Sequence, residues 1–380
     1  MIMNKHINLI KKSFQPILIL LHITGLESLP HKGFSKNSFL NFVLKCLQYL
    51  FRILECVAVA SQLIASALLL NNKVHWVLFI LVLLQVIVNL QTRKSRKQIH
   101  LSLITLHKCA QKLHCLQDGR KFQTSIFAYF SVMFGLNFSY IISYFYSSEG
   151  IMFKTSMKNS QFASQEVKQF FIFVPEILSV AFPVLSALVF ISLTGYYGFV
   201  CFYAKFIFNR IEEKIKNLNK DCSCMPIIHT YVKLTTLLKS LDDYFSFSAF
   251  VIVLSSLTGL FYVNFGIHFL CVGDVIHFLA AEIWFSTLVC IIILSASATN
   301  SASLAAKEAI YSLPGKIPRY YYELEVLIRS DCMRDVSLTL WKIYKIDRSL
   351  ILSALGTLIT YGMLLVTMGS TIKSKPPKAQ

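Results

Sequence analysis

Two acidic residues, Glu176 and Glu282, stand inside long apolar stretches of this chain, and Trp284 and Phe285 closely follow the second. Where such a stretch crosses a membrane, a carboxylate is costly and is therefore often functional. Aromatic and histidine side chains are expected at a similar depth, and the complete candidate set is Tyr140, Tyr144, Glu176, Tyr262, Phe265, His268, His277, Glu282, Trp284 and Phe285. An aromatic box with one or two carboxylates can stack on a sugar ring or hold an ammonium or amine group. The same rings would equally suit a membrane-interface belt or a packed core.

Two other groups of polar residues are expected to be structural. Arg52 and Glu55 lie three residues apart near the inner end of the first apolar stretch, and they are predicted to pair or to reach toward the membrane surface. The segment HKCAQKLHC, residues 107–115, contains histidines and cysteines, but their spacing does not repeat a tetrahedral zinc pattern. We therefore expect a helix over this segment and no metal.

Motifs of enzymes and cofactor sites are missing from the sequence. The chain contains no G-x-G-x-x-G, Walker or G-x-S-x-G pattern. We therefore predict neither an enzymatic activity nor a bound cofactor.

The elements that position the candidate residues are predicted to be membrane-spanning helices. The chain has 380 residues, of which 55% are hydrophobic and 15% charged, and its mean hydropathy is +0.59. A helix is expected for each long apolar run, because lipid offers no hydrogen-bond partner to the backbone. The seven predicted spans are Tyr49–Leu70, Val74–Leu90, Thr124–Phe145, Phe170–Leu193, Phe247–Cys271, Val275–Ala296 and Ser349–Gly369. The predicted fold class is an all-α membrane protein with seven transmembrane helices.

Basic residues alternate strongly between the segments that join these spans. The N-terminal segment and every second connection after it hold 29 Lys and Arg residues, and the alternate segments hold 7. By the positive-inside rule, the N-terminus is cytoplasmic and the C-terminus extracellular. The net charge of +18 is explained mostly by this topology, so no nucleic-acid partner is predicted.

The cytoplasmic segments are predicted to be helical as well. Residues 208–218, 227–245 and 320–346 have apolar residues at a spacing of three to four, with charged residues between them. The helices should therefore continue below the bilayer into a compact cytoplasmic layer. Such a layer can hold subunits together, because water supplies there the hydrophobic driving force that lipid lacks.

The last apolar stretch carries a stripe of small and hydroxylated residues on one helical face. The members of this stripe are Ser349, Ser353, Gly356, Thr360, Leu364, Thr367 and Thr371. Small residues let helices pack closely and hydrogen bond to one another, and they would also line a narrow watery path. A packing helix and a pore helix both remain open on this pattern.

The end of the chain resembles the C-terminal signature of arthropod gustatory receptors, which are related to insect odorant receptors. That signature has a lead-in rich in Leu and Asp, followed by a helix with Thr-Tyr, five apolar residues, Gln and Phe. Here Asp347 and Arg348 precede the apolar run, Thr360-Tyr361 supplies the dipeptide, and five residues later the Gln and Phe positions hold Thr367 and Met368. The segment SFQPILILLHITGLESLP, residues 13–30, resembles the family's N-terminal opening.

The resemblance implies a ligand-gated, non-selective cation channel of the plasma membrane, assembled as a homo- or hetero-tetramer with other gustatory receptors. Four copies of the last helix would surround the pore, with Thr360, Leu364, Thr367, Met368 and Thr371 lining or closing it, and a ring of Leu364 and Met368 could close by dewetting. A small-molecule tastant would bind in the outer half of the first six helices.

The implied organisation has five parts. The parts are a cytoplasmic N-terminal segment (1–48), a six-helix ligand-binding bundle with cytoplasmic extensions (49–296), a cytoplasmic anchor segment (297–348), the pore-lining helix (349–370) and an extracellular tail (371–380).

Two other classes of membrane protein share some of these features. A G-protein-coupled receptor also has seven spans, but it needs an extracellular N-terminus, and the charge distribution contradicts that. A transporter is typically built from inverted repeats with broken helices at matching positions, and no such internal symmetry is visible here. Both classes are kept as alternatives to the channel.

Overall fold

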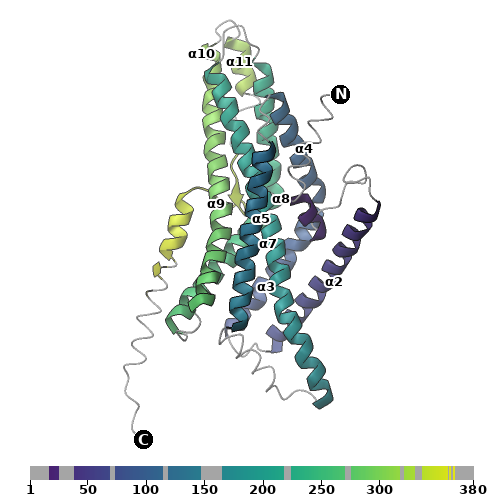
Figure 1. Cartoon of the computed structure of the whole chain (residues 1–380). Coiled ribbons are helices and arrows are strands. Elements are labelled where there is room, and N and C mark those ends of the chain that lie inside the picture. The colour runs from purple at the N-terminus through teal and green to yellow at the C-terminus, as the bar shows by residue number, and fades with distance from the viewer. Residues whose placement is uncertain are drawn as a thin grey trace.

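The computed structural model describes most of the chain. The described residues are 17–24, 38–68, 73–113, 119–146, 165–217, 224–269, 275–316, 321–329, 336–357, 359–360 and 363. Nearly all of them are helical, and Figure 1 shows an elongated bundle of long helices that run roughly side by side.

The labelled elements follow in chain order. They are α2 (Ser38–Leu68), α3 (Lys73–Lys94), α4 (Arg96–Lys112), α5 (Gly119–Tyr146), α7 (Gln165–Lys216), α8 (Met225–Phe269), α9 (Val275–Tyr311), α10 (Leu313–Lys316), α11 (Tyr321–Leu327), β1 (Thr339–Leu340) and β2 (Tyr344–Lys345). A short helix over residues 17–23 precedes them, and residues 349–357 and 359–360 begin the last helix.

The centre of the bundle is made of α7, α8 and α9. They have 52, 45 and 37 residues, so α7 alone is about 78 Å long at the rise of an α-helix. A bilayer core is only about 30 Å thick. These helices therefore continue well beyond the membrane, as predicted from the amphipathic segments 208–218 and 227–245.

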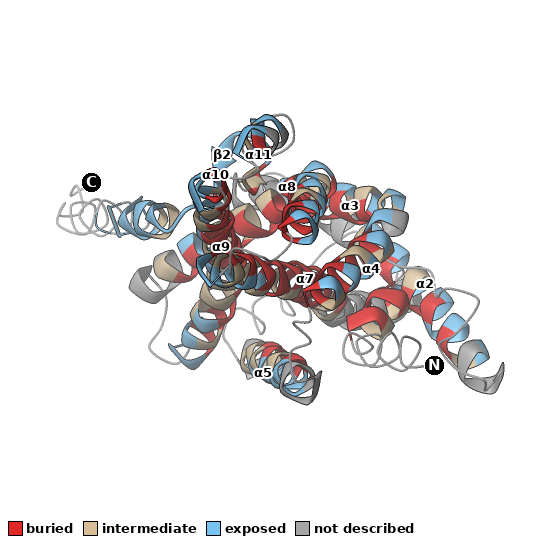
Figure 2. Cartoon of the chain, turned by 90° about the horizontal axis from the view of Figure 1, so that it is seen from above, coloured by how far each residue is buried: buried red, intermediate tan, exposed pale blue. Residues whose placement is uncertain are grey.

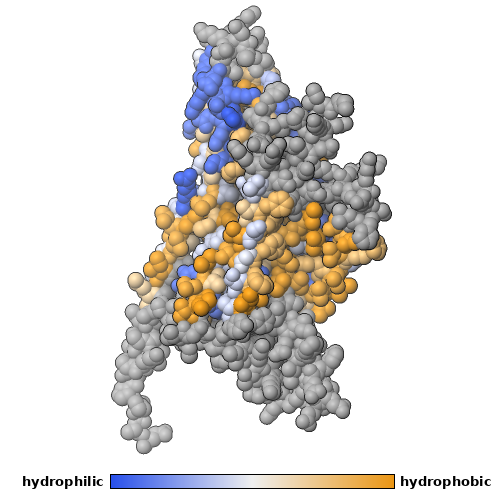
Figure 3. All heavy atoms as spheres, in the orientation of Figure 1, coloured by the Kyte–Doolittle hydropathy of each residue, from blue (hydrophilic) through white to orange (hydrophobic). Residues whose placement is uncertain are grey.

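Four helices of the described part of the chain are long and apolar enough to cross a membrane. They are Thr124–Ser143, Val184–Lys216, Met225–Asn264 and Val275–Tyr311, and each overlaps one of the third to sixth predicted spans. The first two predicted spans fall largely within α2 and α3. Figure 3 shows apolar surface gathered in a broad band, with hydrophilic residues gathered at the end of the bundle where α10 lies.

The core is a continuous set of apolar and aromatic side chains between α7, α8 and α9, seen in red in Figure 2. Tyr197 and Phe245 stack with ring centroids 4.8 Å apart. Three buried hydroxyls join α4, α7 and α8: the Tyr244 hydroxyl lies 2.7 Å from that of Tyr196 and 3.0 Å from that of Ser102. This contact of rings and hydroxyls fixes the three helices against one another.

The helix predicted over residues 320–346 is wrong for the described residues 336–346. Residues 321–329 are helical, but residues 339–345 form a two-stranded antiparallel hairpin in which Thr339 faces Lys345 and Leu340 faces Tyr344. The apolar residues here fit a helical spacing, but they include Thr, Trp, Ile and Tyr, which favour strands. Contacts with α8 and α9, described below, decide the outcome.

Arg52 and Glu55 were expected to pair or to reach toward the membrane surface, and this stays a prediction; the ion pair that Glu55 forms is with a residue of another helix. Glu55 is 7% exposed, and its carboxylate accepts a hydrogen bond from Arg93 Nη2 at 2.7 Å and another from the amide of Asn89. Both partners belong to α3, whereas the Arg52 guanidinium lies over the Tyr49 ring. An ion pair between two helices compensates a buried charge better than a neighbour on one helix, because it also fills the space between them.

Candidate ligand site and pore helix

Three of the ten predicted ligand-site residues lie together where α5 meets α9. The rings of Tyr140 and His277 stack with centroids 5.1 Å apart, and the ring of Phe285 meets Tyr140 edge-on at 6.3 Å. The Ser143 hydroxyl lies 3.2 Å from Nδ1 of His277. Since His277 is buried, this hydrogen bond fixes its ring in the stack. The result is an aromatic cluster with one polar, hydrogen-bonding ring in it.

The third wall of this cluster comes from α8. Val263 of α8 packs with Phe278 and Ala281 of α9, and Tyr140 and Phe285 cover this small apolar group. Gly259 lies on the same stretch of α8. A Cβ atom built there would stand 2.6 Å from ring atoms of Phe285, which is closer than atoms can approach. The contact between α8 and α9 thus requires glycine at this position.

The other candidates are placed differently. Trp284 is buried in the main core, Tyr262 is exposed, and Glu282 is partly exposed on α9. The side chains of Tyr144, Glu176, Phe265 and His268 lie outside the described residues. An aromatic box with carboxylates therefore stays a prediction, whereas the grouping of Tyr140, His277 and Phe285 is observed.

Sequence reasoning missed Ser143, Phe278 and Gly259. Ser143 follows Tyr140 by three positions and so shares its helical face, which is a signal that spacing alone could have supplied. Phe278 and Gly259 carry no comparable signal, because their role depends on how α8 and α9 face each other.

The last helix begins at a defined cap. The Ser349 hydroxyl and the Leu350 N–H both donate to Oδ1 of Asp347, at 2.6 and 3.1 Å. These hydrogen bonds, the first of them above all, lower the pKa of the Asp347 carboxyl below its ordinary value. Asp347, which the family resemblance singled out, thus acts as the N-terminal cap that lets the helix start at residue 349.

The described part of the last helix is exposed on most of its circumference. Ser353, Gly356 and Thr360 of the predicted stripe are exposed, and the neighbouring face carries exposed Leu352 and Ile359. Figures 1 and 2 show this helix beyond α9, away from the centre of the bundle. The remaining predicted pore residues, Leu364, Thr367, Met368 and Thr371, lie outside the described residues, as does Tyr361 of the family motif.

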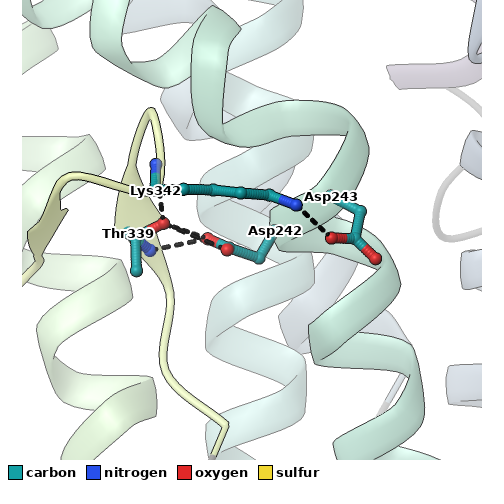
Figure 4. A network of polar contacts seen from close by, with 4 residues as sticks. All are labelled: Asp242, Asp243, Thr339 and Lys342. Atoms are coloured by element: carbon teal, nitrogen blue, oxygen red, sulfur yellow. Dashed lines mark hydrogen bonds and ion pairs between the residues drawn. The ribbon is translucent and has the colours of Figure 1, made fainter.

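Along the chain the β1–β2 hairpin precedes the last helix, and α8 holds it through two acidic residues (Figure 4). Oδ1 of Asp242 accepts hydrogen bonds from the N–H and the hydroxyl of Thr339, at 2.6 and 2.9 Å. Lys342 at the turn forms an ion pair with Asp243 at 2.6 Å. The sequence did not predict this contact, because the segment was assigned to a helix.

Burial and hydrogen bonding shift the pKa of the Asp242 carboxyl in opposite directions. Burial raises the pKa of its carboxyl above the ordinary value, and the two hydrogen bonds from Thr339 offset part of this rise. Asp242 precedes the fifth predicted span, so this chemistry belongs to the layer outside the membrane.

Together, these features define an all-helical membrane protein with an aromatic cluster between α5, α8 and α9 and with an exposed helix at its end. Solved structures with the same fold are those of the insect olfactory receptor OR5 from Machilis hrabei and of the same receptor in complex with eugenol. They superpose with TM-scores of 0.70 and 0.69, over 96% of this chain and 99% of the receptor chain, at 12% sequence identity. At this identity the likeness establishes the fold.

No protein-family model matches the sequence, and no curated protein matches it either.

Proposed function

We propose that the chain is a subunit of a chemosensory, ligand-gated, non-selective cation channel that opens when a small-molecule tastant binds. The observation that carries this proposal is the exposed last helix, which has a stripe of small and hydroxylated residues and is attached to a bundle with the olfactory-receptor fold. Among the described residues, the helix packs on the core only through Leu350 and Ile351 at its start, and most of its remaining side chains are exposed. Copies of the same helix around a common axis would bury it and give the stripe a watery path to line.

The proposed assembly is a tetramer, homomeric or with other gustatory receptors, in the plasma membrane. Ser353, Gly356 and Thr360 face the pore in this arrangement, and Leu364, Thr367 and Met368 form its constriction. Leu352 and Ile359 on the adjoining face then meet lipid or the neighbouring subunit. The family resemblance in the sequence supports the assignment of the constriction, and the exposure of residues 352–360 supports the assembly.

The proposed ligand site is the cluster of Tyr140, His277 and Phe285 with its surroundings. A small ligand with an aromatic or sugar ring could stack there and hydrogen bond to His277 or Ser143. The site lies where α5, α8 and α9 meet, so a ligand that fits one packing of these helices better than another shifts the population toward it. The olfactory receptor neighbour was solved with eugenol, which makes that compound a reasonable first probe.

The proposal is tested by expressing the full chain in a non-native cell and recording currents while sucrose, eugenol and a simple amine are applied. A ligand-evoked cation current is expected. Thr367→Ala and Met368→Ala should alter ion selectivity or gating, and Ile359→Ala, which lies off the polar stripe, is the matched control. Normal selectivity and gating in both pore variants would remove the last helix from the pore.

The ligand site is tested in the same recordings. His277→Ala removes one half of the Tyr140 stack, so the ligand concentration for half-maximal current should rise by up to about tenfold, which corresponds to the loss of an aromatic pair. Trp284→Phe changes a core ring seven positions along the same helix and should leave this concentration nearly unchanged. An equal shift in both variants would count against the assigned site.

A further inference from the structure

We propose that the hairpin over residues 338–346 is a clamp that joins the inner end of the last helix to α8 and α9, with Asn300 as its main positioning residue. This inference rests on the proposed channel function, because it assigns the hairpin a part in gating. It adds a second, distant determinant of opening to the ligand site.

Asn300 of α9 holds both sides of the hairpin at once. Its side-chain amide donates to the carbonyl oxygens of Leu338 and Ile346, at 3.2 and 2.9 Å, and its Oδ1 accepts from the N–H of Leu338 at 2.8 Å. Ile346 N–H in turn donates to Leu338 O at 3.1 Å. Asn300 therefore ties the open end of the hairpin, where the two strands diverge. It is 8% exposed, so these bonds are not shared with water.

The turn of the hairpin is held by α8 in a separate set of contacts. Trp341 lies against Phe247 and Phe250, with centroids 5.7 and 5.2 Å apart, and its N–H donates to the carbonyl oxygen of Ser246 at 3.1 Å. The Asp242 and Asp243 contacts in Figure 4 lie one helical turn earlier on α8. The hairpin is thus fixed at its open end by α9 and at its turn by α8.

The turn has an unfavourable backbone conformation, which its contacts with α8 stabilise. Trp341 and Lys342 both adopt left-handed backbone angles, with φ of 50° and 58°. Residues other than glycine and asparagine avoid this region, and strained residues persist where their surroundings overdetermine them, often at functional elements. Here the surroundings belong to α8: the rings of Phe247 and Phe250 pack against Trp341, and Asp243 pairs with Lys342.

Only a short connection separates the clamp from the last helix. Ile346 is tied to Asn300, Asp347 caps the helix, and the helix starts at residue 349. The inner end of the last helix must therefore follow α8 and α9. When a ligand moves the outer parts of these helices, a fixed inner end converts the movement into bending at the constriction. If the inner end were free, the whole helix would shift and the constriction would not bend.

The functional test compares two neighbouring residues of α9. Asn300→Ala removes three hydrogen bonds to the hairpin. Thr299→Val removes hydrogen bonds to Cys201 O of α7 and to Ser295 O of α9, and neither of these reaches the hairpin. With eugenol as the probe, Asn300→Ala should lower the maximal current per surface channel by about tenfold. This is the effect expected when the free energy that couples the hairpin to the last helix falls by about that of one well-formed buried hydrogen bond. The eugenol concentration for half-maximal current should stay within about twofold, because the ligand site is untouched.

Trp341→Ala, which changes an exposed side chain, is the second variant and should act in the same direction. Wild-type maximal currents in Asn300→Ala would overturn the proposal.

A second measurement does not depend on currents. A carbodiimide joins an amine to a carboxylate in contact with it, with loss of water, so it should link Lys342 to Asp243 in the purified full chain, and mass spectrometry measures the yield. Thr299→Val should keep this yield, and Asn300→Ala should lower it several-fold. If the wild-type chain carries no cation current with sucrose, eugenol or the amine but the yields differ as expected, the channel proposal fails and the clamp stands. Equal yields in Asn300→Ala and wild type would overturn the clamp itself.

Discussion

At Gly259, a missing side chain sets how closely α8 and α9 approach beside the candidate ligand site. The ring of Phe285 occupies the place that a Cβ atom would take, and Phe285 itself packs against Tyr140. Phe285 is therefore held from both sides. A change in the separation of α8 and α9 would therefore move the Phe285 ring and alter its contact with Tyr140 in the aromatic cluster.

We expect Gly259→Ala to destabilise the chain by about 1–3 kcal/mol, the usual cost of overpacking a tight helix contact. Thermal unfolding in detergent measures this change. The control is Gly135→Ala on α5, where a Cβ atom would meet nothing within 4 Å and where alanine should be neutral or stabilising by about 0.5–1 kcal/mol. Equal effects of the two substitutions would show that helix propensity, and not the Phe285 contact, matters at residue 259.

Asp242 makes the docking of the hairpin depend on pH. Its pKa is raised mainly by burial, so the folded state favours the protonated form relative to the unfolded chain. The contribution of this group to stability is therefore fully present below the ordinary pKa of aspartate, about 4, and is lost as the pH rises through the raised value.

Asp242→Asn keeps an oxygen that accepts from Thr339 and removes the titrating charge. We expect it to flatten the pH dependence of thermal stability above pH ~4 and to leave stability at neutral pH unchanged or slightly higher. Melting curves across this pH range test the expectation.

At the scale of elements, the long helices could be predicted and the short ones could not. α5, α7, α8 and α9 coincide with apolar runs of membrane length, because lipid forces any such run to satisfy its backbone within a helix. The hairpin had no such constraint. Its Trp341 and Thr339 fit a helical spacing equally well, and only the contacts from Asn300 and Asp242, which are far away in the sequence, select the strand form.

The same reasoning separates the parts of the candidate site. Tyr140, His277 and Phe285 were found because aromatic and polar residues at one depth of a membrane bundle are few. The exclusion of Trp284 was not predictable, since its direction depends on how α9 rotates against the core. For the same reason the sequence could not supply the partner of Glu55 on α3.

The pairing of α2 with α3 gives a prediction at this scale. Glu55→Ala leaves Arg93 and Asn89 without their acceptor in a buried, apolar region, so it should destabilise the chain by about 3–5 kcal/mol or abolish surface expression. Arg52→Ala removes the contact over Tyr49 and a positive charge near Glu55, but it leaves the ion pair between the two helices in place, so it should cost less than Glu55→Ala. Thermal unfolding in detergent ranks the two variants. If Arg52→Ala were the more damaging, the ion pair between helices would not be what holds α2 to α3.

Over the whole molecule, the hydrophilic surface and the basic segments lie at the same end of the bundle. The end of the bundle that carries α10 is hydrophilic (Figure 3), and it is also where α7 ends and α8 begins, in segments rich in Lys and Arg. The charge rule assigns this end to the cytoplasm. The hairpin clamp then lies toward the inner side, and the aromatic cluster near the start of α9 lies toward the outer side.

This orientation predicts that the two ends of the chain face opposite sides of the membrane. An epitope tag placed before residue 1 should be detected only after the plasma membrane is made permeable, whereas a tag after residue 380 should be accessible on intact cells. The charge asymmetry of 29 against 7 basic residues is the physical reason, because basic loops are retained on the cytoplasmic side. An N-terminal tag accessible on intact cells would instead fit a G-protein-coupled receptor. It would also turn the proposed ligand site toward the cytoplasm, so that an external tastant could no longer reach it directly.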